Sequence, residues 1–215
     1  MSEPDHIIFV VDDDERIRRA LGELFASHDI QCITFGSAGD YVNADKPDLP
    51  ACLILDVELP DINGLDLQQR ISGGEHPPIV FLTGHGDIPS SVSAIKHGAV
   101  DFLTKPFSHA DLMAAIEAAI AQDRHSRSGR TERDALLARY RSLTAREREV
   151  LPLVVSGLLN KQAAAELGIS EVMLQIHRRN VMQKMEAVSL ADLVRLAERL
   201  DIPITHSRRT GDVRK

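Results

Sequence analysis

The amino-acid sequence predicts an α/β domain built on a five-stranded parallel sheet, followed by a small all-α domain. In the first half, five short apolar segments alternate with five amphipathic ones, as in strands and helices that follow one another around a doubly wound sheet. From residue 142 onward the strand pattern stops, and closely spaced short helices are indicated. A length of 215 residues exceeds one typical domain, and 43% hydrophobic residues are enough for two packed cores.

The elements of the first domain follow from the spacing of its apolar residues. Continuous apolar runs of four or five residues predict buried parallel strands, and we expect the strand order 2-1-3-4-5 of a flavodoxin-like sheet. Apolar residues at helical spacing mark the segments between them. Strands are expected over residues 7–11, 31–35, 52–55, 79–83 and 101–104, and helices over residues 14–28, 38–43, 64–73, 88–98 and 108–122.

Capping residues support several of these boundaries. Asp14 precedes a helical pattern and is better explained as the N-cap of the first helix than as a ligand. Asp61 and Asn63, in the segment LPDING, are most simply turn residues. Ser108 and Asp111 offer a cap and its third-position partner for the helix that starts near residue 108.

A polar, Arg-rich segment separates the two predicted domains. Its sequence is interrupted by Gly129, and we interpret it as a linker that could be helical from Thr131 onward. After it, Thr144 with Glu147 forms a capping box, Asn160 is a plausible cap for the next helix, and Ser170 caps the third. Gly168 supplies the tight turn before that third helix. The expected divisions are residues 1–123, a linker over 124–141, a helical domain over 142–203 and a basic tail over 204–215.

Charge is distributed unevenly along the chain. Residues 1–124 contain 8 Lys+Arg and 21 Asp+Glu, a balance of −13, whereas residues 125–215 contain 17 and 11, a balance of +6. An acidic first half suits a cation site, and a basic second half suits a polyanion. Within 142–203, however, eight basic residues are balanced by eight acidic ones, so the nonspecific affinity of this part for a polyanion should be modest.

The sequence predicts a cytoplasmic protein without a membrane partner. No apolar run approaches the roughly 18 residues of a membrane-spanning helix, and the start MSEPDH lacks the basic and apolar regions of a secretory signal. Cys32 and Cys52 fall on the second and third expected strands, which the first strand would separate. We therefore expect two buried thiols and no disulfide.

Three acidic residues are expected at one edge of the sheet. Asp12 and Asp13 follow the first strand in VVDDD, and Asp56 ends the third in CLILDVELP. Ligands of such sheets bind beyond the carboxyl ends of the strands, where the strand order reverses. Clustered carboxylates repel one another unless a hard cation neutralises them, and oxygen ligands suit Mg²⁺. Thr83 and Lys105 end the next two strands, in PPIVFLTG and DFLTKPF, although Thr83 alone could be an ordinary strand residue.

Together these segments resemble the receiver domain of two-component response regulators, over residues 6–123. The resemblance implies that Asp56 accepts a phosphoryl group from a sensor histidine kinase. It also implies that Thr83 and Lys105 hold the phosphoryl oxygens and that the Lys105–Pro106 bond is cis. Phe102 would move behind Thr83 as part of a switch, although it could instead be plain core. The implied Mg²⁺ ligands are Asp12, Asp13, Asp56 and the backbone carbonyl of Glu58.

Glu58 and His85, each two residues beyond a site residue, could tune the lifetime of the phosphoryl group. The sequence itself sets no value for that lifetime.

The second domain resembles the LuxR-type helix-turn-helix over residues 142–200, through SLTAREREVL, NKQAAAELGIS and VMQKM. Both resemblances together place the chain in the FixJ/NarL family of response regulators. Helical spacing puts Leu174, Val181 and Met185 on the inner side of the third helix, and His177 near them. The chain has Met173-Leu174-Gln175 where relatives often have Thr-Val-Lys. The expected DNA contacts are Val172, Gln175, Ile176 and Arg179 on the outer side, and Lys161, Arg178 and Lys184 to phosphates.

The resemblance implies a transcription regulator, more often an activator, that dimerises on phosphorylation through residues 87–104 and contacts double-stranded DNA and RNA polymerase. Two alternatives remain open. One is a regulator that acts without phosphate, against which the complete Asp12, Asp13, Asp56, Thr83 and Lys105 set argues. The other is an enzyme with an external substrate, for which the sequence offers no Gly-rich phosphate loop and no nucleophile elbow. We therefore expect no enzymatic activity beyond the phosphorylation of Asp56 itself.

Overall fold

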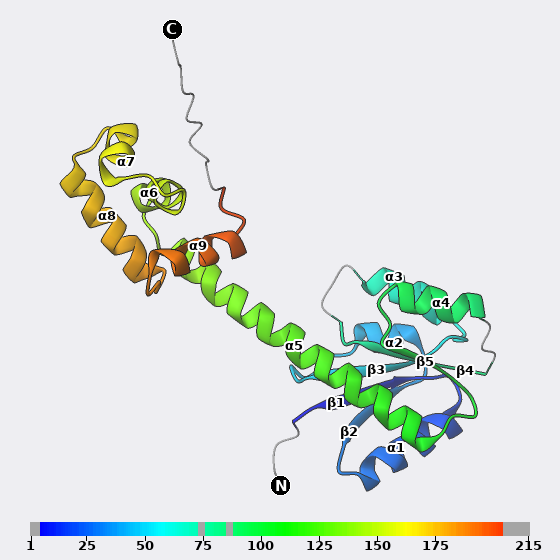
Figure 1. Cartoon of the computed structure of the whole chain (residues 1–215). Coiled ribbons are helices and arrows are strands. Elements are labelled where there is room, and N and C mark those ends of the chain that lie inside the picture. Colours follow the sequence, from blue (N-terminus) through cyan, green and yellow to red (C-terminus); the bar gives the residue numbers. More distant parts are fainter. Residues whose placement is uncertain (1–4, 73–75, 85–87, 204–215) are drawn as a thin grey trace. The chain divides into compact units, whose positions relative to one another are not determined.

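A computed structural model describes residues 5–72, 76–84 and 88–203 (Figure 1). The expected tail, residues 204–215, and His85 lie outside these ranges. The chain divides into two compact units, Met1–Ser128 and Gly129–Lys215. None of the described helices is long and apolar enough to cross a membrane.

The N-terminal unit is built on a parallel sheet with the order β2-β1-β3-β4-β5, as predicted. Neighbouring strands pair in parallel throughout, which places all their carboxyl ends at one edge. The central strands are buried, because helices cover both faces of the sheet. The strands are β1 (Ile7–Val11), β2 (Gln31–Phe35), β3 (Ala51–Asp56), β4 (Ile79–Thr83) and β5 (Asp101–Thr104).

Helices lie on both faces of the sheet and separate its core into two layers (Figure 1). Alternate strand residues such as Phe9 and Phe81 pack under α2, α3 and α4. Their neighbours, such as Ile8 and Leu82, pack under α1 and the first part of α5. The covering helices are α1 (Glu15–Ser27), α2 (Ala38–Asn43), α3 (Gly64–Ile71), α4 (Ile88–Lys96) and α5 (His109–Arg141).

The two cysteines lie on strands that flank β1. Ile8 is the register partner of Cys32 on one side and of Cys52 on the other, so β1 separates the two thiols. Both are free, as predicted, but only Cys52 is buried and Cys32 is half-buried. Burial raises the pKa of each thiol, to about 11 for Cys32, so neither is poised to react as a thiolate.

Helix α5 is much longer than predicted. The expected end near residue 122 is wrong, because one helix runs from His109 to Arg141 and includes the whole segment predicted as a linker. The part of α5 in the N-terminal unit is anchored by Asp123, whose buried carboxylate accepts a hydrogen bond from the Ala51 N–H at 2.9 Å. Arg127 forms ion pairs with Asp123 and with Asp48. Its last turns belong to the other core, in which Leu136 is buried.

The C-terminal unit packs four short helices around one apolar core, together with the end of α5. The predicted capping box of Thr144 and Glu147 is present, Ser170 caps the third helix, and Gly168 ends the second with a φ of 63°. Asn160 is not the cap that we expected, because Leu159 occupies that position and its N–H donates to the Gln162 side chain. The helices are α6 (Ala145–Val155), α7 (Asn160–Leu167), α8 (Glu171–Lys184) and α9 (Leu190–Arg199).

Candidate functional site

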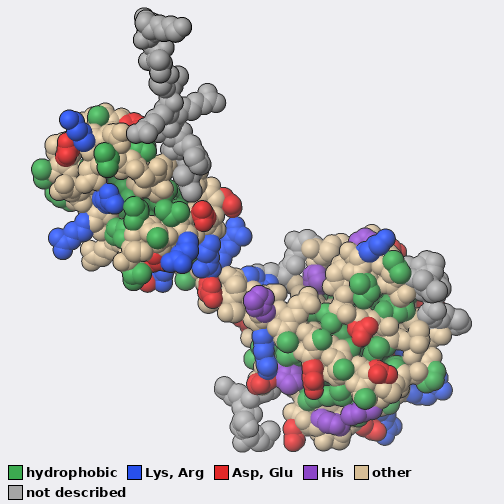
Figure 2. All heavy atoms as spheres, viewed as in Figure 1, with side chains coloured by type: hydrophobic (Ala, Val, Ile, Leu, Met, Phe, Trp, Pro, Cys, Tyr) green, Lys and Arg blue, Asp and Glu red, His purple; other side chains and the backbone are tan. Residues whose placement is uncertain are grey.

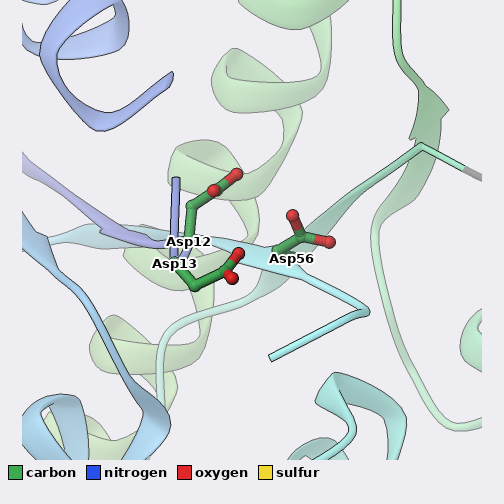
Figure 3. A group of neighbouring side chains, drawn as sticks. All are labelled: Asp12, Asp13 and Asp56. Carbon is green, nitrogen blue, oxygen red and sulfur yellow. The ribbon is translucent and has the colours of Figure 1, made fainter. Parts of the chain in front are cut away.

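The sheet brings three carboxylates together at its carboxyl edge. Asp12 and Asp13 directly follow β1, and Asp56 is the last residue of the adjacent β3. Figure 3 shows the three side chains grouped beside these strand ends. One oxygen of each lies within 4.8 Å of the others, and Asp13 is exposed while the other two are buried. The cluster is therefore open to solvent on one side, as a site for an incoming group has to be.

Lys105 supplies a positive charge to this cluster. Its Nζ lies 2.7 Å from Asp12 Oδ2 and 2.6 Å from Asp56 Oδ2, so one ammonium bridges two buried carboxylates. Burial raises the pKa of Asp12, and the hydrogen bond from Lys105 opposes that rise only in part. Burial alone would lower the pKa of Lys105, but its two carboxylate partners raise it, so the lysine stays charged.

Backbone contacts fix the positions of the carboxylates. The N–H of Glu58 donates to Asp56 Oδ1 at 3.0 Å, and the N–H of Asp14 donates to Asp12 Oδ1 at 2.8 Å. Arg18 binds the carbonyl oxygens of Asp12 and Asp13 through Nη1, at 2.7 and 2.9 Å. A single guanidinium on α1 thus holds the loop that presents both acidic residues.

Gly64 lets helix α3 begin directly against the site. A Cβ at this position would lie 2.3 Å from the carbonyl oxygen of Asp56, too close for any side chain. Its N–H also donates to the Val57 carbonyl at 2.8 Å. Only a residue without a side chain fits there, because the obstacle is backbone that cannot move aside.

Thr83 and Phe102 lie on neighbouring strands, Thr83 at the end of β4 and Phe102 two residues before the end of β5. Thr83 is fully buried at the end of β4, and its carbonyl accepts a hydrogen bond from the Lys105 N–H at 2.7 Å. The Lys105–Pro106 peptide is cis, as predicted. Phe102 is half-buried and packs on Phe81, with ring centroids 5.9 Å apart. This packing fits a core role, while its partial exposure leaves the predicted switch role open.

Two residues of the site neighbourhood have roles that the sequence did not indicate. Arg18 was one of several arginines on an amphipathic helix, and only the fold places its guanidinium under the Asp12–Asp13 loop. Asp61, interpreted as a turn residue, accepts hydrogen bonds from the N–H groups of Ala38 and Gly39 at the start of α2. The Gly39 N–H is the main cause that lowers the pKa of Asp61. Asn63, in turn, caps α3.

The donor set fits a hard divalent cation. All three side chains offer carboxylate oxygens, and Glu58, whose backbone carbonyl was predicted to join them, lies two residues after the end of β3. Two of the carboxylates are buried, and a single lysine cannot balance three negative charges. Such a cluster, open on one side, suits Mg²⁺ with some of its positions left to water.

The second candidate surface is the outer side of α8. Leu174, Val181 and Met185 are fully buried in the core of the C-terminal unit, as predicted. Opposite them, Val172 and Ile176 are exposed, and Gln175 and Arg179 are exposed beside them. The structure therefore leaves the predicted base-contacting residues open to a partner.

The residues predicted to contact phosphates differ in whether another side chain already binds them. Lys161 is exposed at the start of α7. Arg178 donates to the Asn160 side chain at 3.0 Å, and Lys184 Nζ lies 2.7 Å from Glu147 Oε2. Lys184 is thus already part of an ion pair with a buried carboxylate, which joins the end of α8 to α6. His177 is half-buried, and its Nδ1 has no hydrogen-bond partner among the described atoms.

Comparison with known proteins identifies a known domain in each of the two parts of the chain that contain the candidate surfaces. Residues 8–117 match the model of the response regulator receiver domain, and residues 141–197 match that of bacterial regulatory proteins of the luxR family. The chain therefore belongs to the response regulators with a receiver domain and a LuxR-type helix-turn-helix, the FixJ/NarL family.

Individual relatives span nearly the whole chain. Nodulation protein W of Bradyrhizobium diazoefficiens is 46% identical over 95% of this chain and 90% of its own length. The transcriptional regulatory protein FixJ of the same species is 41% identical over 89% and 94%. Among solved structures, the low-resolution structure of the response regulator StyR is 43% identical, with a TM-score of 0.79 over 90% of this chain and 98% of that one. The chain is thus a DNA-binding response regulator of a two-component system.

Proposed function

We propose that Asp56 is the phosphoacceptor of this regulator and that its phosphorylation by a sensor histidine kinase controls transcription. The observation that carries the proposal is the arrangement around Asp56, whose carboxylate lies at the carboxyl edge of the sheet between two further carboxylates and Lys105. One of its oxygens accepts the Glu58 N–H, which holds the carboxylate in place. A carboxylate held in place is the nucleophile that aspartyl phosphorylation needs.

In the proposed reaction, a carboxylate oxygen of Asp56 attacks the phosphorus of a phosphohistidine on the kinase. The new O–P bond forms as the N–P bond breaks, and the released imidazole takes a proton from solvent. Lys105 then moves its contact from the carboxylate oxygen to a phosphoryl oxygen, and the Thr83 hydroxyl donates to another. Asp12, Asp13, Asp56 and the Glu58 carbonyl would hold Mg²⁺, which shields the negative charges that otherwise repel the incoming phosphoryl group.

The proposed output is a change at the surface of α4 and β5. Movement of Thr83 toward the phosphoryl group would leave room behind it, which Phe102 fills. Val92 and Ile95, on α4, have exposed fractions of 46% and 47%, and such apolar side chains suit the predicted dimer contact. A dimer would then bind two DNA half-sites, recruit RNA polymerase and, by analogy with the family, activate transcription.

The test is enrichment of genomic DNA fragments by the full-length protein at physiological salt, with and without Mg²⁺ and acetyl phosphate as donor. We expect a few sites to be enriched only with the donor, and Asp56→Asn to lose this response. Asp45→Asn is the matched control, because Asp45 is an exposed loop carboxylate outside the cluster. Equal enrichment without donor, or an unchanged response in Asp56→Asn, would favour a regulator that acts without phosphate.

A further inference from the structure

Gln68 is a buried polar residue that the proposed reaction does not use. Only 2% of its surface is exposed, and it lies on α3 beside Leu67 and one turn after Gly64, which are also buried. Residues three and four positions apart share one side of a helix, so the side of α3 that meets the backbone of Asp56 at Gly64 continues to Gln68. A polar side chain in such a place needs hydrogen-bond partners.

The partners of Gln68 lie at the C-terminal end of α4. Its side-chain amide Nε2 donates to the carbonyl oxygens of Ala94 and His97, both at 3.2 Å. The last carbonyls of a helix lack the regular partners of the carbonyls before them, so a donor from outside the helix holds its end in place. The amide has two N–H groups to give, one for each carbonyl. Gln68 therefore ties the last turn of α4 to α3.

The turn that Gln68 holds belongs to the proposed dimer surface of α4 and β5. Ile95 lies inside this turn, and Val92 lies three residues earlier on the same side of the helix. Figure 2 shows green hydrophobic side chains open to solvent over the part of the N-terminal unit where Figure 1 places α3 and α4. Directly after the turn, the N–H of Val100 donates to the Ile79 carbonyl of β4 at 2.8 Å, and β5 follows. An anchor at this place determines where α4 presents its apolar side chains.

The anchor should remain closed when Asp56 is phosphorylated. Opening it would leave a buried amide without partners, and each lost hydrogen bond is worth roughly fivefold in an equilibrium constant. A phosphoryl group can shift a two-state equilibrium only by its differential affinity for the two states, so a rearrangement that keeps both bonds is favoured over one that breaks them. The proposed change at Thr83 and Phe102 then takes place around a fixed end of α4.

We infer that Gln68 is a positioning residue, which anchors the C-terminal turn of α4 to α3 before and after phosphorylation and so holds the dimer surface in place. This inference rests on the proposed phosphorylation switch and adds the fixed point around which it works. The side-chain hydrogen bonds of Gln68 go to α4, so their loss should leave Mg²⁺ binding and the phosphorylation of Asp56 unchanged.

The test is Gln68→Met, which keeps an unbranched side chain of similar size but has no N–H group. Hydrogen exchange is measured first, on the full-length protein without a phosphoryl donor. The amides of Gly98 and Ala99 bind carbonyls of the anchored turn, and both should exchange about twentyfold faster in the variant, the value of two lost hydrogen bonds. With Mg²⁺ and acetyl phosphate, phosphate incorporation should be unchanged. Dimerisation, measured by sedimentation, should weaken by a similar factor, because the turn has to be fixed again when a partner covers it.

Gln69→Met is the matched control, because Gln69 is the next residue of α3 and is exposed. It should exchange, incorporate phosphate and dimerise like the natural protein. Unchanged exchange or unchanged dimerisation in Gln68→Met would overturn the inference and leave the phosphorylation proposal standing. Loss of phosphate incorporation in Gln68→Met would also overturn it, since Gln68 would then belong to the packing that supports Asp56. A natural protein that takes up no phosphate, or that does not dimerise when it does, would overturn both proposals.

Discussion

Gly64 places the start of α3 directly against the backbone of Asp56, the proposed phosphoacceptor. A Cβ there would lie 2.3 Å from the Asp56 carbonyl oxygen, so Gly64→Ala should shift β3 or α3 and lower the free energy of unfolding by about 3 kcal/mol. Gly22→Ala is the control, since nothing lies within 4 Å of its Cβ position inside α1. It should raise the stability by roughly 0.5–1 kcal/mol. Urea unfolding of both variants measures the two changes in unfolding free energy. Similar changes in both variants would contradict a clash at Gly64.

Arg18 offers a second prediction about a single residue. Because its guanidinium holds the carbonyls of Asp12 and Asp13, Arg18→Ala should let the loop move and weaken Mg²⁺ binding about tenfold, measured by calorimetric titration of the full chain. Arg18→Lys should retain part of the affinity through one remaining hydrogen bond. Arg19→Ala removes only an exposed pair with Glu23 and should bind Mg²⁺ normally. An unchanged affinity in Arg18→Ala would show that the loop needs no such support.

The connection between α6 and α8 should respond to acid through Glu147. Burial would raise the pKa of this carboxyl, but the Lys184 ammonium and the Thr144 N–H outweigh burial and hold it at about 2. A pKa below the usual 4.5 means that the ionised group stabilises the fold above pH 4.5, and that this contribution is lost as the pH falls toward 2. The difference in unfolding free energy between the natural protein and Glu147→Gln should therefore shrink by up to about 3 kcal/mol over this range. A difference that is independent of pH would exclude the ion pair as its source.

Most helices and strands could be predicted from the sequence, because the spacing of apolar residues and the helix caps are local signals. All five strands lie within one residue of their expected ranges, and Asp14, Thr144 and Ser170 cap the helices that follow them. A helix from Thr131 onward was considered, but its continuity with the helix before it was not predicted, since Ser126, Ser128 and Gly129 have low helix propensity. Its helical state depends on anchors far away in sequence, such as the Ala51 N–H on Asp123.

The candidate sites also contain features with a signal in the sequence and features that depend on distant contacts. That Asp12, Asp13 and Asp56 lie together could be predicted because strand ends in a parallel sheet converge. The contact of Asp61 with residues 22 and 23 positions earlier has no local signal. Lys184 shows the opposite case, in which a basic residue on the right helix is already bound by an internal carboxylate. Its role as a phosphate contact stays a prediction.

Coupling between the two units is the property of the full chain that we expect to depend on Phe102. Phe102→Ala should leave phosphorylation of Asp56 intact while DNA binding no longer responds to it, because the space behind Thr83 is not refilled. Phosphate incorporation and DNA binding, measured on the same preparation, separate this outcome from misfolding. Loss of both activities would instead assign Phe102 to the core, next to Phe81.

Dimerisation should also set the salt dependence of DNA binding. A dimer doubles the number of phosphate contacts, so the slope of log affinity against log salt concentration should about double on phosphorylation. Binding to one of the enriched genomic fragments is measured at several salt concentrations, with and without acetyl phosphate, and gives both slopes. Tight binding by the unphosphorylated monomer at physiological salt would contradict the dependence on dimers.

Helix α5 contains buried residues as far as Asp123 and again at Leu136, with a solvated stretch between these two positions. Asp123, Arg124 and Arg127 hold it to the receiver, and Leu136 packs into the core of the C-terminal unit. Between Asp123 and Leu136 no described residue is buried. A recombination event in that stretch would join two foreign domains without opening either core. This stretch of α5 is thus a suitable fusion site, at which evolution or protein engineering can join one receiver domain to a different effector domain.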